Sequence, residues 1–292
     1  LYIMVEFCGA YVEYMGQDVL ENINIVVDDG DFIALFGRDD IGKSVLCHTI
    51  TGYAACYRGI VKVFDREAAS LTQSDYKKIR FVPDEVLAEL MPARRFFNMA
   101  LHACNRYNTE LQDNLCEKYG INIDERMDNM TYQDNKLVQI IAAICASPEL
   151  FILDEPKKYL SEPVWQIVCE ELKKMNETDT TIIVTVEKFE DIDRYCNCYA
   201  CLRDKQVIAV DNIEPGVACH PVKVVTVADG NNQYIEDICE KCIADNGDTH
   251  IYVYNGEMNR LTDALARSGC SDWTVENMSF EENLAGDYSR WE

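Results

Sequence analysis

Long apolar runs are missing from this 292-residue chain. The stretch from Leu137 to Ala146 is among the longest and contains Gln139, whereas a helix that spans a bilayer needs about 20 predominantly apolar residues. The first residues, Leu1 to Cys8, contain neither a basic segment nor a cleavage-like site, so we expect no signal peptide. The lack of a long apolar run and the lack of a signal-peptide pattern together predict a cytosolic protein.

Basic residues are scarce relative to acidic ones. The chain has 27 Lys and Arg against 51 Asp and Glu, which gives a formal net charge of −24 at pH 7. A surface of this sign repels a phosphate backbone, so we expect no nucleic-acid partner. The 14 cysteines are numerous but scattered through apparent strands and helices, and without an export signal they are typical of reduced thiols.

Two cysteine pairs, Cys198 with Cys201 and Cys239 with Cys242, have the spacing of zinc ligands. On a strand, the odd separation of the first pair directs its side chains to opposite faces. The second pair falls within an apparent helix, in an amphipathic pattern with Ile235 and Ile238. We therefore interpret all four as core or surface thiols. The four histidines lie near no plausible set of bases or ligands, and we assign none of them.

The chain does contain a complete phosphate-loop pattern. Gly37-Arg38-Asp39-Asp40-Ile41-Gly42-Lys43-Ser44 fits G-x-x-x-x-G-K-[ST], after the apolar run Phe32 to Phe36 and before the helix-compatible segment Val45 to Ile50. The glycines let successive N–H groups converge on a phosphate, and the helix N-terminus adds a partial positive charge. Lys43 would reach the terminal phosphates, and the Ser44 hydroxyl would ligate magnesium. The plainer alternative is a chance match in a surface turn.

A second candidate segment is Leu150 to Pro156, an apolar strand that ends in two carboxylates. The C-terminal edge of a parallel strand, beside the phosphate loop, is the usual location of an active site in such sheets. Asp154 would hold magnesium through water, and Glu155 would polarise the attacking water. The alternative is a charged strand end without a role.

Hydrophobic periodicity predicts an α/β chain with a helical insertion at about 87–148 and a small α+β domain after the Pro215-Gly216 punctuation. We place the domains at 1–216 and 217–292. Predicted strands are Ile3–Phe7, Ala10–Tyr14, Ile23–Val27, Phe32–Phe36, Gly59–Phe64, Ile79–Val82, Leu150–Leu153, Thr180–Val186, Cys198–Leu202, Gln206–Val210, Val222–Val227, Thr249–Tyr254 and Trp273–Met278. Predicted helices include Ser74–Lys78, one that opens at Thr131, Glu162–Met175, Glu190–Tyr195, Gln233–Ala244, Met258–Ser268 and Phe280–Tyr288.

The order of these pieces resembles an ATP-binding subunit of an ABC transporter over nearly the whole chain. Gly37 to Ser44 matches its Walker A motif, Leu150 to Glu155 its Walker B motif, and Leu160-Ser161-Glu162 its D-loop. The ending Ser279 to Leu284 is similar to that of exporter-type subunits. The resemblance implies a P-loop NTPase fold of ABC type, with a mixed sheet core, an antiparallel β subdomain and a helical subdomain.

The resemblance also implies ATP and Mg²⁺ as cofactors and ATP hydrolysis with Glu155 and Lys43 as catalytic residues. Magnesium would contact Ser44, Asp84 and Asp154. The implied nucleotide-binding residues are Tyr14 as the adenine platform, Gly37, Arg38, Asp39, Asp40, Ile41, Gly42, Lys43, Ser44 and Val45. The implied partners are an integral membrane transporter subunit and a second ATP-binding subunit, as a homodimer or heterodimer. The location would be the cytoplasmic face of the cell membrane.

The chain departs from the family pattern at four places. The signature loop L-S-G-G-Q aligns with Met130 to Asp134, the Q-loop glutamine with Asp84 and the switch histidine with Val186, while Asp40 replaces a common Walker A glycine. We therefore keep two hypotheses. The first is an ATPase that drives an exporter. The second is a hydrolysis-deficient ATP-binding module, or the degenerate half of a heterodimeric ATPase.

Overall fold

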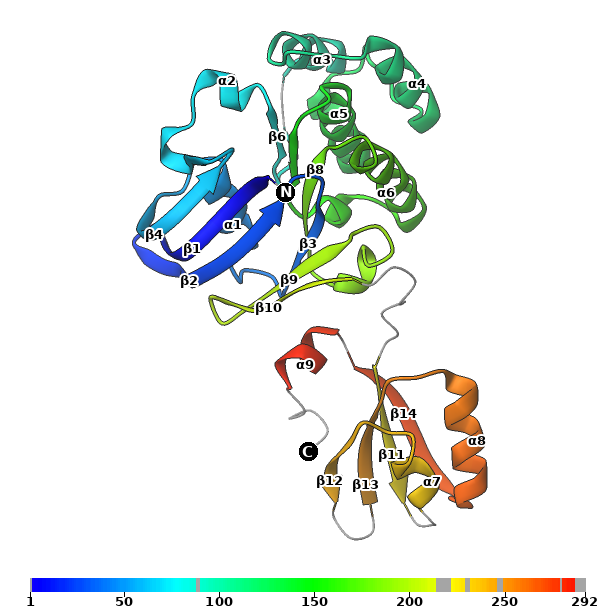
Figure 1. The fold of residues 1–292 in the computed structure, drawn as a ribbon. Helices are drawn as coiled ribbons and strands as arrows, with labels where there is room; N and C mark the ends of the chain where they lie inside the picture. The colour runs from blue at the N-terminus through cyan, green and yellow to red at the C-terminus, as the bar shows by residue number, and fades with distance from the viewer. Residues whose placement is uncertain are drawn as a thin grey trace. The chain divides into compact units, whose positions relative to one another are not determined.

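The computed structural model describes residues 2–87, 90–213, 222–228, 232–245, 249–278 and 280–286. It divides into two units, Leu1–Pro215 and Gly216–Glu292. Figure 1 shows the first unit as two sheets with helices and the second as a single sheet with helices. In the described part of the chain, no helix combines the length and apolarity needed to cross a membrane.

A six-stranded sheet forms the centre of the first unit, in the order β10-β9-β3-β8-β7-β6. Neighbouring strands are parallel except β9 and β10, which form the predicted antiparallel hairpin. The continuous apolar runs of β3 and β7 are buried along their whole length, as expected for strands covered on both faces, and so is β8, which also contains two threonines. The strands are β3 (Phe32–Phe36), β6 (Ile79–Val82), β7 (Leu150–Leu153), β8 (Thr181–Val186), β9 (Cys198–Arg203) and β10 (Gln206–Asn212).

An antiparallel sheet of the order β2-β1-β4-β5 lies beside it in the first unit. Its strands are β1 (Ile3–Tyr14), β2 (Gln17–Asp28), β4 (Cys56–Val63) and β5 (Arg66–Glu67). The prediction of two strands before Gly16 is wrong, because β1 is continuous. The pairing of β1 shifts register between Phe7 and Ala10, where Gly9 has φ +56° and donates its N–H to Asn24 Oδ1 at 2.9 Å. That local irregularity resembles a strand end in the sequence.

The helices of the first unit follow the predicted order, and α3, α4 and α5 gather on one side of it (Figure 1). Thr131 caps α5, and its Oγ1 accepts the Asp134 N–H at 3.1 Å. The predicted helix Glu190–Tyr195 is wrong. The chain there makes one 3₁₀ turn at Phe189–Asp191, which buries Phe189 and Ile192 before β9. The helices are α1 (Lys43–Ile50), α2 (Gln73–Tyr76), α3 (Ala93–His102), α4 (Thr109–Tyr119), α5 (Tyr132–Cys145) and α6 (Glu162–Asn176).

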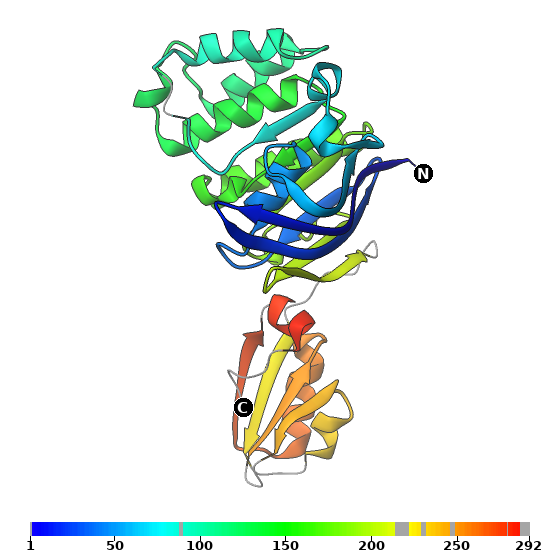
Figure 2. The ribbon, with the colours of Figure 1, turned by 90° about the vertical axis from the view of Figure 1, so that its left-hand side faces the viewer.

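The second unit is an antiparallel sheet of the order β12-β13-β11-β14, and its chain order is β-α-β-β-α-β followed by a terminal helix. Leu261 and Leu265 of α8 pack with Val225 and Val227 of β11; Figure 2 shows α8 on one face of this sheet. Its elements are β11 (Val222–Ala228), α7 (Gln233–Glu236), β12 (Lys241–Asp245), β13 (Thr249–Tyr254), α8 (Met258–Ser268), β14 (Asp272–Met278) and α9 (Phe280–Ala285).

The predicted helix Gln233–Ala244 is wrong beyond its first turn. Lys241–Asp245 is β12, an edge strand that pairs with β13. Cys239 is half-buried and Cys242 is exposed on this strand, so the two thiols do not share a helical face. At the end of the chain α9 stops at Ala285, and the predicted continuation to Tyr288 lies outside the described residues.

Candidate functional site

The loop between β3 and α1 needs glycine at both of its pattern positions. Gly37 has φ +152°, and a Cβ there would lie 2.4 Å from the carbonyl oxygen of Leu202. Gly42 has φ +106°, and its Cβ would lie 2.9 Å from Leu20 Cδ2. Gly42 is also the N-cap of α1 and supplies no side-chain acceptor to the first turn. The backbone N–H groups of that turn are therefore suited to an anion.

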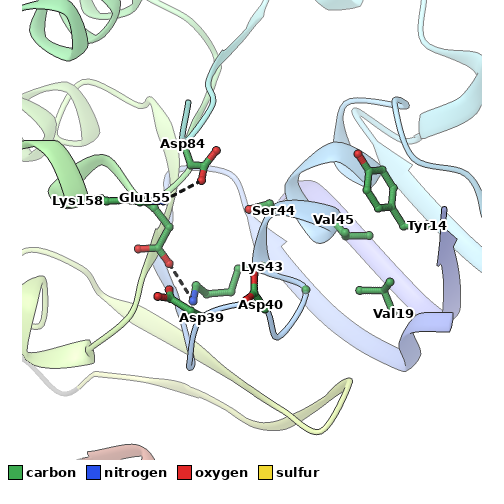
Figure 3. A pocket seen from close by; sticks show the side chains of 11 residues that line it. Tyr14, Val19, Asp39, Asp40, Lys43, Ser44, Val45, Asp84, Glu155 and Lys158 are labelled. Carbon is green, nitrogen blue, oxygen red and sulfur yellow. Dashed lines mark hydrogen bonds and ion pairs between the residues drawn. The ribbon is translucent and has the colours of Figure 1, made fainter. Parts of the chain in front are cut away.

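Lys43 connects this loop to the end of β7. Its Nζ donates to the carbonyls of Gly37 at 2.5 Å and Arg38 at 2.9 Å, and it lies 2.8 Å from Glu155 Oε1 (Figure 3). Burial raises the pKa of Glu155, and the hydrogen bond from Lys43 opposes that rise. Glu155 has φ +44° and ψ +45°, a left-handed conformation that is uncommon outside glycine. Its backbone N–H is held by Thr185 Oγ1 at 2.8 Å.

Asp154 lies directly behind the loop and is 1% exposed. The hydroxyl of Thr185 donates to its Oδ1 at 2.6 Å. Burial raises the pKa of Asp154, while hydrogen bonds from Thr185 and Ser44 oppose the rise. Thr185 thus bonds both carboxylate residues. Thr185 was not predicted as a site residue. The only sign of it in the sequence is one polar residue near the end of the otherwise apolar run Ile182 to Val186.

These side chains surround a cavity of about 510 Å³. Its lining comprises Tyr14, Val19, Asp39, Asp40, Gly42, Lys43, Ser44, Val45, Asp84, Glu155 and Lys158. All of these except Val19 and Lys158 were predicted from the sequence. Of the other predicted site residues, Gly37, Arg38, Ile41 and Asp154 do not line the cavity. Figure 3 shows Tyr14, Val19 and Val45 on one side, Asp84 and Glu155 on the other, and Lys43 and Ser44 between them.

The cavity lining carries more negative than positive charge. Asp39, Asp40, Asp84 and Glu155 are opposed by Lys43 and Lys158, and Lys158 Nζ lies 3.4 Å from Asp84 Oδ2. Polyphosphate entering here would need a cation to offset this charge.

The donor set fits magnesium that arrives with phosphates. Ser44 and Asp84 present oxygen atoms to the cavity, and Asp154 lies behind Ser44. Oxygen ligands suit this hard cation, which is usually bound through one or two carboxylates together with substrate phosphates. Within the described residues no group of three or more His, Cys, Asp or Glu side chains is arranged to hold a metal ion alone.

The remaining departures from the family pattern lie away from the cavity lining. Met130 to Asp134 spans the start of α5, where Tyr132 is 72% exposed. Val186 ends β8 with 1% exposure. Ser279 lies outside the described residues, so the match of Ser279 to Leu284 is not described as a whole.

The fold is the P-loop NTPase fold of the ABC cassette class. Residues 20–158 match the family model for the ABC transporter. More particularly, this segment resembles the ATP-binding domain of an ABC transporter. Its fold is shared with a solved ATP-binding subunit of an ABC transporter (TM-score 0.65, 22% identity, 72% of this chain and 90% of that one). It is also shared with the MJ0796 cassette dimer in a post-hydrolysis state bound to ADP and Pi (TM-score 0.64, 18% identity, 72% and 99%).

Curated relatives include proteins named for sugar import. The chain is 21% identical over 219 residues to the ribose import ATP-binding protein RbsA of Halalkalibacterium halodurans, covering 70% of this chain and 44% of that protein. It is 23% identical to the arabinose import ATP-binding protein AraG of Rhizobium johnstonii (70% and 43%). The ABC transporter ATP-binding protein YtrB of Bacillus subtilis is 21% identical (68% and 68%). The chain therefore spans less than half the length of the sugar-import relatives.

Proposed function

We propose that this chain binds and hydrolyses ATP and drives an ABC transporter through a separate integral membrane subunit. The observation that carries the proposal is the meeting of Lys43 and Glu155, 2.8 Å apart, at one cavity between the phosphate loop and the end of β7. Loop and lysine bind phosphate, and a carboxylate beside them can take a proton from water.

Each residue has a distinct task in this proposal. A terminal phosphate would replace the carbonyls of Gly37 and Arg38 as the partner of Lys43, which also releases Glu155 to accept a proton from the attacking water. Tyr14 would support the adenine base of ATP at the other side of the cavity. Ser44 and Asp84 would hold Mg²⁺, with Asp154 orienting Ser44 from behind. The bound cation would neutralise charge on the phosphates.

The test is nucleotide binding and turnover in matched variants. Lys43→Ala should weaken Mg-ATP binding at least tenfold, about 1.4 kcal/mol, whereas Glu155→Gln should retain binding and lose turnover. Lys62→Ala, a surface lysine paired with Glu6 on the antiparallel sheet, is the control and should change neither. Unchanged binding in Lys43→Ala would show that the nucleotide does not use this loop.

The proposed membrane partner would contact the segment around Asp84 to Arg95. An apolar groove of about 300 Å³ borders it, lined by β6, α3 and α5, and it includes Leu87 and Phe96. Leu90, in the same segment, is 75% exposed. Binding there would place the chain at the cytoplasmic face of the cell membrane. Cross-linking from Leu90→Cys to a membrane subunit in native membranes should succeed, and recovery of the protein with no such subunit would contradict this part of the proposal.

Export is the direction favoured by the resemblance at the C-terminal end, and the second unit is the feature that supports it. The names of the ribose and arabinose relatives point to import instead. Measuring accumulation against efflux in vesicles that contain the membrane partner separates the two directions.

A second candidate function is a cassette with little activity of its own, which dimerises with an intact subunit. The start of α5 favours it, because Tyr132 and Gln133 put side chains where the family has glycines, and the Asp134 carboxylate accepts a hydrogen bond from Thr131 Oγ1 at 2.7 Å. Bulk and negative charge there oppose a phosphate. Loss of one transition-state donor typically costs about 10²–10³ in rate.

We therefore expect slow phosphate release from the isolated subunit, measured against Glu155→Gln as background. Addition of a partner subunit with an intact signature loop should restore turnover at one site. Fast turnover in a preparation shown to be homodimeric would contradict this second function.

A further inference from the structure

Lys136, in the second turn of α5, is a lysine with no exposed surface. Its ammonium donates to three backbone carbonyls of one short segment, at 2.6 Å to Pro83, 3.2 Å to Asp84 and 2.8 Å to Glu85. An ammonium has three donors, so these acceptors can satisfy it completely. Burial still lowers the pKa of Lys136 to about 8. Burying a charged ammonium costs free energy, so the burial of Lys136 calls for a reason beyond packing.

The neighbouring residue holds the same segment at its other end. Asn135 Nδ2 donates to the carbonyl of Leu87 at 2.7 Å and to that of Met127 at 2.8 Å. Gln139, one turn further along α5, donates to Asn135 Oδ1 at 3.0 Å and supports this amide. The segment 83–87, which has no helix or strand of its own, is thus fastened to α5 through four of its carbonyls.

The fastened segment carries Asp84, whose side chain lines the nucleotide cavity with Ser44. Asp84 follows β6 by two residues, so its placement depends on how the chain leaves that strand. The Nζ of Lys136 lies 5.1 Å from the centre of the Tyr159 ring. Lys158, the residue paired with Asp84, lies 5.7 Å from the same ring.

We propose that Lys136 is a positioning residue that holds Asp84 at the cation-binding side of the nucleotide cavity. The inference rests on the proposed function, because it assumes Mg-ATP in that cavity. Lys136 never reaches the ligand. It acts on the backbone of residues 83 to 85, and its removal leaves three carbonyls of that segment without their shared donor. A shift of about 1 Å in a positioning contact can cost 10²-fold in function.

The test measures how ATP binding depends on magnesium. In Lys136→Met, which keeps the length of the side chain and removes the charge, the Mg²⁺ concentration for half-maximal ATP binding should rise about tenfold, as it does when residues that orient metal ligands are changed. ATP binding in EDTA should stay within about twofold of the wild type, because Lys43 and the loop are unchanged. Asp84→Asn should raise the Mg²⁺ requirement in the same way.

The control is Thr180→Val, which removes a buried hydroxyl bond to the carbonyl of Pro148 and touches neither α5 nor the segment 83–87. It should lower the stability without changing the Mg²⁺ requirement. The double variant Lys136→Met with Asp84→Asn should be no worse than Asp84→Asn alone, because both changes act on the same carboxylate. Lys136→Arg, which keeps charge and donors, should recover part of the loss.

Three results would overturn the inference: an unchanged Mg²⁺ requirement in Lys136→Met, or in Lys136→Gln if the methionine variant does not fold; additive effects in the double variant; or an equal shift in Thr180→Val. If the wild-type protein binds ATP in a Mg²⁺-dependent way and one of these results is found, only the proposed role of Lys136 is contradicted. A wild-type protein that binds no ATP would contradict the proposed function and this inference together.

Discussion

Thr185 occupies the point where the two carboxylate residues at the end of β7 meet. Its Oγ1 donates to Asp154 at 2.6 Å and accepts the N–H of Glu155 at 2.8 Å. Glu155 needs such support because its backbone is left-handed. One hydroxyl therefore orients the side chain of the first carboxylate residue and the backbone of the second.

Replacing this hydroxyl is expected to damage turnover more than binding. Thr185→Val preserves the shape but leaves the buried carboxylate of Asp154 with one donor fewer, at a cost of about 1–3 kcal/mol in the free energy of unfolding. Because Glu155 also loses its backbone restraint, kcat should fall more than tenfold, about 1.4 kcal/mol, with a smaller change in KM. Thr180→Val, next to the opposite end of β8, is the control. It removes a similar hydroxyl bond, to Pro148, and should lower stability alone.

Asp40 stands at a position where the phosphate-loop pattern does not require a particular residue. It has φ +61° and lines a cavity that already holds three other carboxylates. Asp40→Gly should tighten Mg-ATP binding, since one unit charge about 4 Å away in water is worth about 1 kcal/mol. The gain should shrink as salt rises, because screening weakens it.

The matched control for Asp40→Gly is Asp65→Gly, because Asp65 has the same φ of +61° and does not line the cavity. Both variants relieve a similar backbone conformation, so both should change stability alike. Isothermal titration of ATP into the two proteins should show tighter binding in Asp40→Gly only. Equal affinities would mean that the charge of Asp40 does not act on the ligand.

At the scale of elements, the sequence predicted best where local pattern and tertiary contacts agree. Buried parallel strands such as Phe32–Phe36 and Leu150–Leu153 have the predicted bounds, and so does Met258–Ser268, because their apolar spacing matches the faces they bury. The phosphate loop could be predicted because close contacts require glycine at two fixed positions, and this requirement appears in the sequence as a pattern. These parts of the fold and site depend on residues near one another in the chain.

The failures came from contacts between distant residues. Residues 241–245 have helical spacing, yet they form a strand because the edge of β13 offers backbone partners. Thr185, Lys136 and Lys158 serve the site only because β8, α5 and the turn after β7 converge there. No spacing in the sequence encodes that convergence, so these residues were missed.

Gly59 tests how closely two strands approach within the antiparallel sheet. A Cβ at this position, where φ is +85°, would lie 2.1 Å from the carbonyl oxygen of Gly9. Gly59→Ala should therefore push β4 away from the irregular part of β1. We expect a loss of more than about 2 kcal/mol in the free energy of unfolding, beyond the usual range of about 1 kcal/mol for a strained glycine replacement.

Gly30→Ala provides the comparison, because Gly30 has φ +83° but no neighbour within 4 Å of its Cβ position. The loss of unfolding free energy in Gly30→Ala measures the cost of the backbone conformation alone. The additional loss in Gly59→Ala measures the cost of the clash with Gly9. Denaturant unfolding of both proteins gives that difference directly. Equal losses would show that β1 and β4 separate at little cost.

For the whole molecule, the two units have separate hydrophobic cores. One core lies between the antiparallel sheet, α1 and the central sheet, and the other lies under α8. A unit with its own core can unfold as its own cooperative transition. The proposed nucleotide cavity is lined entirely by residues of the first unit.

Mg-ATP should therefore stabilise one transition and leave the other unchanged. At a free ligand concentration about 100 times the Kd, binding stabilises the unit that binds by about 2.7 kcal/mol. Differential scanning calorimetry of the full chain should show two transitions, of which only the one belonging to Leu1–Pro215 moves upward with Mg-ATP. Lys43→Ala should abolish that movement without shifting the second transition. If both transitions moved together in the wild type, the units would unfold as one, and the second unit would be part of what ATP binding stabilises.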